Sequence, residues 1–122
     1  MFEGRAEEAM RYYAEHVPGC EIVEIVHYGA GEQGAEGSVL RGDLRVANLA
    51  VTCMDSSIHH AFTFTPSISL FVTCDSLEEI SRVARALGDG GQVLMGLADY
   101  GFSKQFTWLN DRFGVSWQLN LP

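Results

Sequence analysis

The sequence predicts an α+β fold made of two β-α-β-β-β modules in tandem. Two segments with a helical pattern begin at Ala6 and Leu77, 71 residues apart, and carry adjacent glutamates at matching positions. Three β-type runs follow each of them. A repeat of this length is too long for a solenoid unit and is typical of a duplicated module. We therefore expect one domain over residues 1–122, with module 1 at about 1–58, a linker at 59–66 and module 2 at about 67–122.

Both helical segments are amphipathic. Their apolar residues recur at the three- and four-residue spacing of one helix face, as Ala6, Ala9, Met10 and Tyr13 in the first and Leu77, Ile80, Ala84 and Leu87 in the second. Ser76 and Glu79 have the spacing of a capping box at the start of the second helix. Glycines after each segment predict where the helices stop.

Short β-type runs make up most of the remaining chain. In module 1 we expect strands at 21–28, 38–46 and 49–54, with Ala47 and Asn48 as a tight turn. In module 2 we expect one strand before the helix, at 67–74, and three after it, at 92–98, 104–110 and 115–121. The matching first strand of module 1 would fall on Met1 and Phe2, so we expect it to be truncated.

Composition excludes several classes of partner. The net charge is −8, from sixteen acidic and eight basic residues without a basic cluster, which disfavours nucleic acids and anionic membranes. The three cysteines have no zinc-binding spacing and are expected to be reduced. No secretory signal and no apolar run of about 20 residues is visible. We therefore expect a cytoplasmic protein.

Two long segments resemble a known family. The runs FTFTPSISLFVTCDSLEEI and DYGFSKQFTWLNDRFGVSWQLNL are similar to the PhnB-like branch of the vicinal oxygen chelate superfamily, which includes glyoxalase I, bleomycin-resistance proteins and extradiol dioxygenases. Members of the branch often bear the label 3-demethylubiquinone-9 3-methyltransferase. The resemblance implies that the modules form an open curved sheet around a concave cavity, with the helices outside. It also implies that metal-dependent members place His, Gln or Glu ligands on the first and last strands of the modules.

Strand alternation predicts which side chains line that cavity. A turn over residues 111–114 would pair Leu109 with Ser116, Trp108 with Trp117 and Thr107 with Gln118. The helix-facing side would then hold Phe106, Trp108, Val115, Trp117, Leu119 and Leu121, and the cavity side Thr107, Leu109, Ser116, Gln118 and Asn120. In 67–74, alternation assigns Ile68, Leu70 and Val72 to the helix side. We expect the ligand contacts to come from Ser67, Ser69, Phe71, Thr107 and Gln118.

The metal positions that the resemblance implies are poorly suited to a metal. They match Gln118 on the last strand and a position at or near Ser67 on the opening strand. A divalent cation prefers carboxylate or imidazole to an amide and a hydroxyl. We therefore expect no metal and no cofactor. A metal-dependent alternative would need ligands from elsewhere, such as His27, His59 or Glu24.

Two further motifs have simple structural interpretations. Residues 29–34 match GxGxxG, but a strand-like run follows where a dinucleotide site needs a helix, so we expect a β-β loop. The same missing architecture gives no support to methyltransferase activity with S-adenosylmethionine. Adjacent His59 and His60 are expected in an exposed linker, where neighbouring side chains point to opposite sides.

The residues favour a metal-free protein that binds a small organic molecule in its cavity, as bleomycin-resistance relatives do. A metal-dependent enzyme of the glyoxalase or dioxygenase type is the alternative, and an interaction module with a filled cavity is a third hypothesis. Whether any reaction is catalysed stays open. The truncated first strand leaves a sheet edge that needs covering, so we also expect a homodimer.

Overall fold

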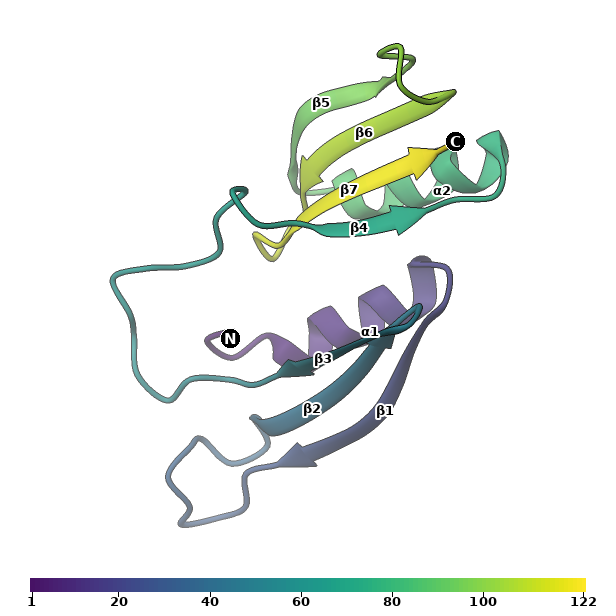
Figure 1. Cartoon of the computed structure of the whole chain (residues 1–122). Helices are drawn as coiled ribbons and strands as arrows, with labels where there is room; N and C mark the ends of the chain where they lie inside the picture. The colour runs from purple at the N-terminus through teal and green to yellow at the C-terminus, as the bar shows by residue number, and fades with distance from the viewer. The chain divides into compact units, whose positions relative to one another are not determined.

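Two amphipathic helices lie where the sequence predicts them. The computed structural model describes all 122 residues, and helices α1 (Ala6–His16) and α2 (Leu77–Gly88) are shown in Figure 1. The Glu79 N–H donates to Ser76 Oγ at 3.0 Å, which confirms the predicted cap of α2. Helix α1 has no such cap of its own. Instead Asp55, after the third strand, accepts hydrogen bonds from the N–H groups of Gly4 and Ala6.

The first module holds a three-stranded antiparallel sheet. Its strands β1 (Cys20–His27), β2 (Val39–Val46) and β3 (Leu49–Cys53) lie in the order β1-β2-β3, with α1 against one face. Gly42 leaves room for the helix, because a Cβ there would lie 2.4 Å from the sulfur of buried Met10. The opening strand is a single parallel bridge between Phe2 and Asp55, which confirms its predicted truncation.

The second module holds a four-stranded sheet. Strands β4 (Leu70–Thr73), β5 (Gln92–Ala98), β6 (Gln105–Asn110) and β7 (Ser116–Leu121) lie in the order β4-β7-β6-β5, and β4 runs parallel to β7. Helix α2 packs on one face through buried Ile80, Val83 and Leu87. The other face has no helix on it within this module, and we call it the open face. The expected strand at 67–74 begins only at Leu70, because Ser67 lies in a turn after Pro66.

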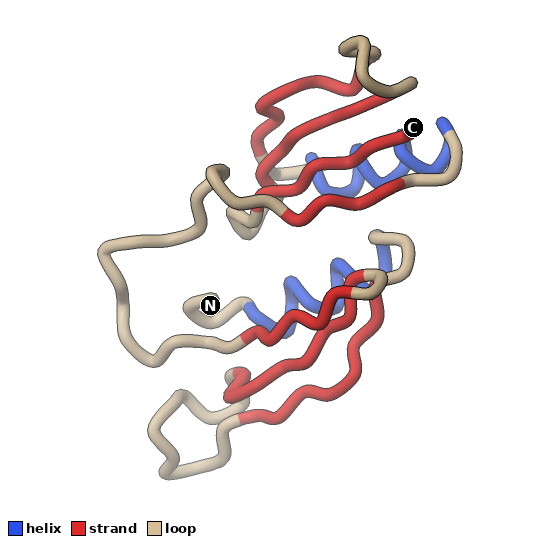
Figure 2. The backbone as a smooth tube through the Cα atoms, viewed as in Figure 1, coloured by secondary structure: helices blue, strands red, loops and turns tan.

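The chain divides into two compact units, Met1–Ala61 and Phe62–Pro122, each of which contains one module. The boundary falls inside the predicted linker. The α+β fold with two open sheets of β-α-β-β-β type is confirmed, and Figure 2 shows the helix and strands of each unit. That the two units make one domain stays a prediction. Neither helix has the length and apolar character needed to cross a bilayer.

The pairing of β6 with β7 differs by one residue from the sequence prediction. The structure pairs Leu109 with Trp117 and Trp108 with Gln118. The loop closes one residue earlier than expected, because the Asp111 N–H donates to the Val115 carbonyl and Gly114 adopts a positive φ of 91°. This is a three-residue hairpin loop whose last residue is in the left-handed region. A one-residue shift moves every β6 side chain to the other face.

Candidate functional site

The open face of the second unit is the best candidate site. Its middle row, read across neighbouring strands by register, consists of Phe71, Gln118, Trp108 and Met95. Phe71 is 58% exposed, and the Gln118 amide is partly exposed. The Gln118 side chain makes no hydrogen bond within the protein. An unpaired amide between two aromatic residues can therefore bind a polar group of a ligand while the rings contact its apolar part.

A polar row lies beside the middle row. It consists of Ser69, Ser116, Asn110 and Gln92, which are neighbours by register across the four strands. Ser116 is buried, and its Oγ lies 2.7 Å from Ser69 Oγ and accepts a hydrogen bond from Trp108 Nε1 at 2.9 Å. These bonds hold the indole of Trp108 in place. In contrast, Asn110 Oδ1 is buried and has no hydrogen-bond partner.

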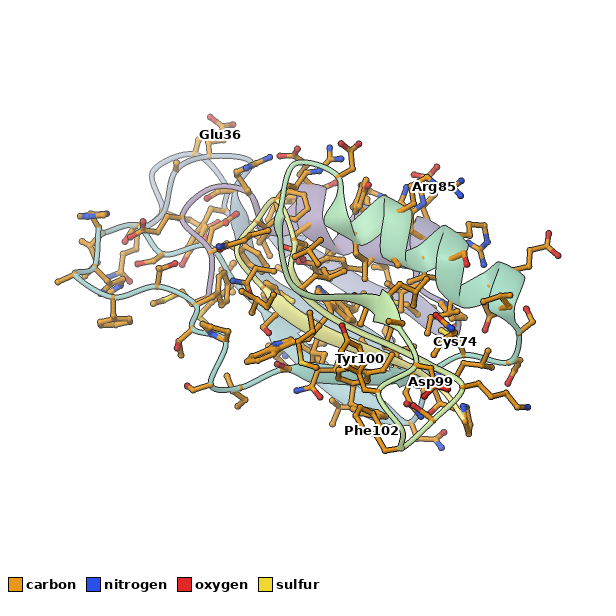
Figure 3. The ribbon with its side chains drawn as sticks, turned by 90° about the horizontal axis from the view of Figure 1, so that it is seen from above. Glu36, Cys74, Arg85, Asp99, Tyr100 and Phe102 are labelled. Atoms are coloured by element: carbon orange, nitrogen blue, oxygen red, sulfur yellow. The ribbon has the colours of Figure 1, made fainter.

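Aromatic rings gather at the other end of the open face. Phe106 lies on this face, opposite Asn120, and its ring centroid is 5.0 Å from that of Phe102 and 6.2 Å from that of Tyr100. Tyr100 and Phe102 belong to the loop between β5 and β6, which Figure 3 shows on the side of the sheet away from α2. The Tyr100 hydroxyl donates to the Gly96 carbonyl at 2.7 Å and fixes the loop. The open face is thus polar at one end and aromatic at the other.

Three of the five predicted site residues share this face. Ser69 bonds to Ser116, and Phe71 lies next to Gln118 by register, as strand alternation predicts. Ser67 lies in the turn before β4, where it is exposed and its Oγ is 3.3 Å from Thr65 Oγ. Ligand binding by these residues stays a prediction.

The predicted placement of Thr107 is wrong. Thr107 is 2% exposed, lies on the helix side of β6 and donates from Oγ1 to the Met95 carbonyl. Leu109 is on that side too, and it is buried. Phe106 and Trp108, which were expected beneath the helix, instead belong to the open face. The physical reason is the shorter hairpin loop, which reverses the faces of β6 relative to β7.

Sequence reasoning therefore missed Trp108 and Asn110 as residues of the open face. The signal that could have placed them is Gly114, since a glycine at the last position of the loop is typical of a three-residue hairpin. Asp111 adds to this signal. It is buried, accepts from the N–H groups of Phe113 and Val115 through Oδ1, and accepts from Trp117 Nε1 through Oδ2 at 2.8 Å.

The corresponding face of the first unit has different chemistry, because it is charged. Arg41 binds Asp43 at 2.6 Å, and Arg45 binds Glu21 at 2.6 Å. The hydrogen bond from Arg41 lowers the pKa of Asp43 from its ordinary value. Glu24 lies 3.9 Å from Arg41. The charged groups on this face thus already have partners of opposite sign.

The side chains proposed for a metal-dependent alternative have separate partners. His27 contacts Glu7, and that hydrogen bond holds the pKa of Glu7 below its ordinary value. His59 Nδ1 lies 3.2 Å from Glu3 Oε2. The pKa of Glu3 is below its ordinary value, mainly because Glu3 accepts a hydrogen bond from the backbone N–H of His60. No group of three or more His, Cys, Asp or Glu side chains that could hold a metal ion occurs in the structure.

The two strand positions at which the resemblance implies metal ligands do not fit a metal ion. Register places Phe71, not Ser67, beside Gln118. A phenyl ring supplies no ligand atom, and an amide alone is a weak ligand for a divalent cation. The glycine-rich residues 29–34 lie between β1 and β2, so the expectation of a β-β loop is confirmed and no helix begins there.

Comparison with known proteins identifies the family of this chain. The model of the family described as 3-demethylubiquinone-9 3-methyltransferase matches residues 1–120. The chain belongs to this family. A PhnB protein from Bacillus cereus, provisionally described as a 3-demethylubiquinone-9 3-methyltransferase, is 48% identical, with a TM-score of 0.94 over 100% of this chain and 95% of that one. The resemblance to the PhnB family that the sequence indicates is thereby confirmed.

Other solved structures have a similar fold. Protein PA1353 from Pseudomonas aeruginosa is 27% identical, with a TM-score of 0.77 over 98% of this chain and 91% of that one. A glyoxalase/bleomycin resistance protein/dioxygenase from Alicyclobacillus acidocaldarius shares the fold at 11% identity, with a TM-score of 0.56 over 99% and 86% of the two chains. No curated protein matches this chain.

Proposed function

We propose that this PhnB family member binds a small organic molecule on the open face of its second unit, without a metal ion. The Gln118 amide carries the proposal, because it is partly exposed, makes no hydrogen bond within the protein and lies between Phe71 and Trp108. An amide both donates and accepts, so it can orient a ligand. Ser69 contributes indirectly, since its bond to Ser116 supports the position of the Trp108 indole.

The chemistry of the open face supports binding more than catalysis. Its polar groups are amides and hydroxyls, which orient a ligand but are weak acids and bases near neutral pH. No His, Asp or Glu occupies the strand positions of this face. The family name specifies a methyltransferase reaction, which would need a binding site for a methyl donor. The glycine-rich loop offers no helix N-terminus for such a site.

Ligand-observed NMR with a library of small aromatic and aliphatic fragments tests the proposal. We expect hits whose binding weakens about three- to tenfold in Gln118→Met, because one neutral hydrogen bond is worth roughly 0.5 to 1.5 kcal/mol. Gln105→Met is the matched control, since Gln105 lies on the opposite face of the same sheet. Equal loss in both variants, or no hits at all, would contradict the proposal.

The metal-free part of the proposal has its own test. After treatment with a chelator, the protein should show no stoichiometric binding of zinc, nickel or manganese in isothermal titration. A single tight site for any of these ions would favour the enzyme alternative. We also propose that the protein is a cytoplasmic homodimer, and light scattering during size-exclusion chromatography at low concentration would expose a monomer.

A further inference from the structure

We infer that the compound bound on the open face of the second unit is an uncharged, flat ring compound with at least one N–H or O–H donor. This inference rests on the proposed function and adds the chemical class of the ligand. Three properties of the open face support it: the absence of charge, the spacing of its aromatic residues, and a buried acceptor that lacks a donor.

The open face has no charged side chain at any strand position. The middle row of the face consists of Met95, Trp108, Gln118 and Phe71, and the polar row has only amides and hydroxyls. The remaining strand positions of the face hold Ala98, Phe106, Asn120 and Thr73. A charged ligand would lose hydration here without gaining an opposite charge, which is strongly unfavourable. The net charge of −8 disfavours anions further. The uncharged face therefore disfavours ions of either sign, and the net charge adds to this only for anions.

The aromatic residues favour a flat ring. Phe71 and Trp108 lie on β4 and β6, on either side of β7, so their backbones are roughly 10 Å apart, which is two strand spacings. Gln118 lies between them. The Trp108 indole is held by its bond to Ser116 Oγ, so one wall is already ordered before binding. A planar ring above Gln118 would contact aromatic surface on both sides.

The amides define the polar edge of that ring. Asn110 on β6 lies opposite Ser116 on β7, and Ser116 is two residues from Gln118 along the same strand. Asn110 and Gln118 are therefore diagonal neighbours, with backbones roughly 7 to 8 Å apart. This separation suits one six-membered ring with a polar group at each end. Asn110 Oδ1 has no donor in the protein, and an unsatisfied buried acceptor is unfavourable. Since Asn110 is partly exposed as a residue, rotation of its amide would let a ligand N–H or O–H satisfy it.

Three matched probes test the charge of the ligand. Nitrogen-15-labelled protein would be titrated at neutral pH with para-hydroxybenzamide, para-hydroxybenzoate and para-hydroxybenzylamine, which are neutral, anionic and cationic. We expect the neutral probe to shift the Trp108 indole and Gln118 amide signals with a Kd of about 1 mM, which is typical of a fragment. The two ions should bind about tenfold more weakly or worse.

A probe without an N–H or O–H donor tests the role of Asn110. Asn110→Leu should weaken para-hydroxybenzamide about three- to tenfold but leave N,N-dimethyl-para-methoxybenzamide, which has no donor, unchanged. A merely structural role of Asn110 would weaken both probes equally and would overturn this part of the inference. Tighter binding of an ionic probe on the same face would overturn the inference and leave the proposed function intact. Failure of every probe and of the fragment library would overturn both.

Discussion

The carboxylate of Asp111 should be the most costly polar group to remove from the second unit. Asp111 is 3% exposed and accepts hydrogen bonds from two backbone N–H groups and from Trp117 Nε1. A hydrogen bond to a charged group is worth roughly 1.5 to 3 kcal/mol, and the bond from buried Trp117 has no water to replace it. The two backbone donors are only partly buried and recover some hydration. We therefore expect Asp111→Ala to lower the free energy of unfolding by about 3 to 5 kcal/mol.

Urea denaturation followed by tryptophan fluorescence measures this loss. Against a total stability of about 5 to 15 kcal/mol, the change should also lower Tm by roughly 10 to 20 °C. Asp99→Ala is the matched control, because Asp99 also accepts from a backbone N–H in a hairpin loop but is exposed. The control should lose less than about 1 kcal/mol. Equal losses of stability in the two variants would contradict a special contribution of the buried Asp111 carboxylate.

Three further predictions concern the first unit and the buried thiols. Asp55→Ala should cost about 2 to 4 kcal/mol and speed hydrogen exchange at Ala6 and Val39, because Asp55 accepts from both backbone N–H groups; unchanged exchange would contradict this. Gly42→Ala should cost about 1 to 3 kcal/mol by crowding Met10, and truncation of Met10 should relieve part of the loss in a double-mutant cycle. Burial raises the pKa of the Cys20 and Cys74 thiols to about 11, so both should react slowly with a disulfide reagent at pH 8 until the protein unfolds. Since the unfolded thiols ionise at lower pH than the folded ones, stability should fall as the pH rises from about 9 through 11; a flat profile there would count against their burial.

The elements of the fold could be predicted because their patterns are local. Helix α1 has the bounds that the three- and four-residue spacing of apolar residues indicates, and β5 runs over the predicted Gln92–Ala98. Strand β4 was predicted too long at its start, since alternation does not detect the turn at Pro66 and Ser67. Local pattern thus defined the elements well and their ends less well.

The pairing between strands could not be read from alternation alone. Strand β7 alternates strictly, but β6 carries apolar residues at the adjacent positions Trp108 and Leu109, so either register would bury an apolar residue of β6. The register is set by the hairpin loop, in which buried Asp111 and left-handed Gly114 stabilise a loop of three residues instead of four. The sequence places Phe71 and Ser69 correctly because they alternate with Leu70 and Val72, which pair with Trp117 and Leu119 on the helix side of β7. It misplaces Thr107 because the faces of β6 depend on the length of the hairpin loop.

The most direct test of the proposed site is a crystal structure of the protein with para-hydroxybenzamide. We expect Trp108 on the open face, with Nε1 bonded to Ser116, and the probe between Trp108 and Phe71 with a hydrogen bond to the Gln118 amide. Density for the probe only at another place, or Trp108 packed beneath α2 with Thr107 on the open face, would contradict it.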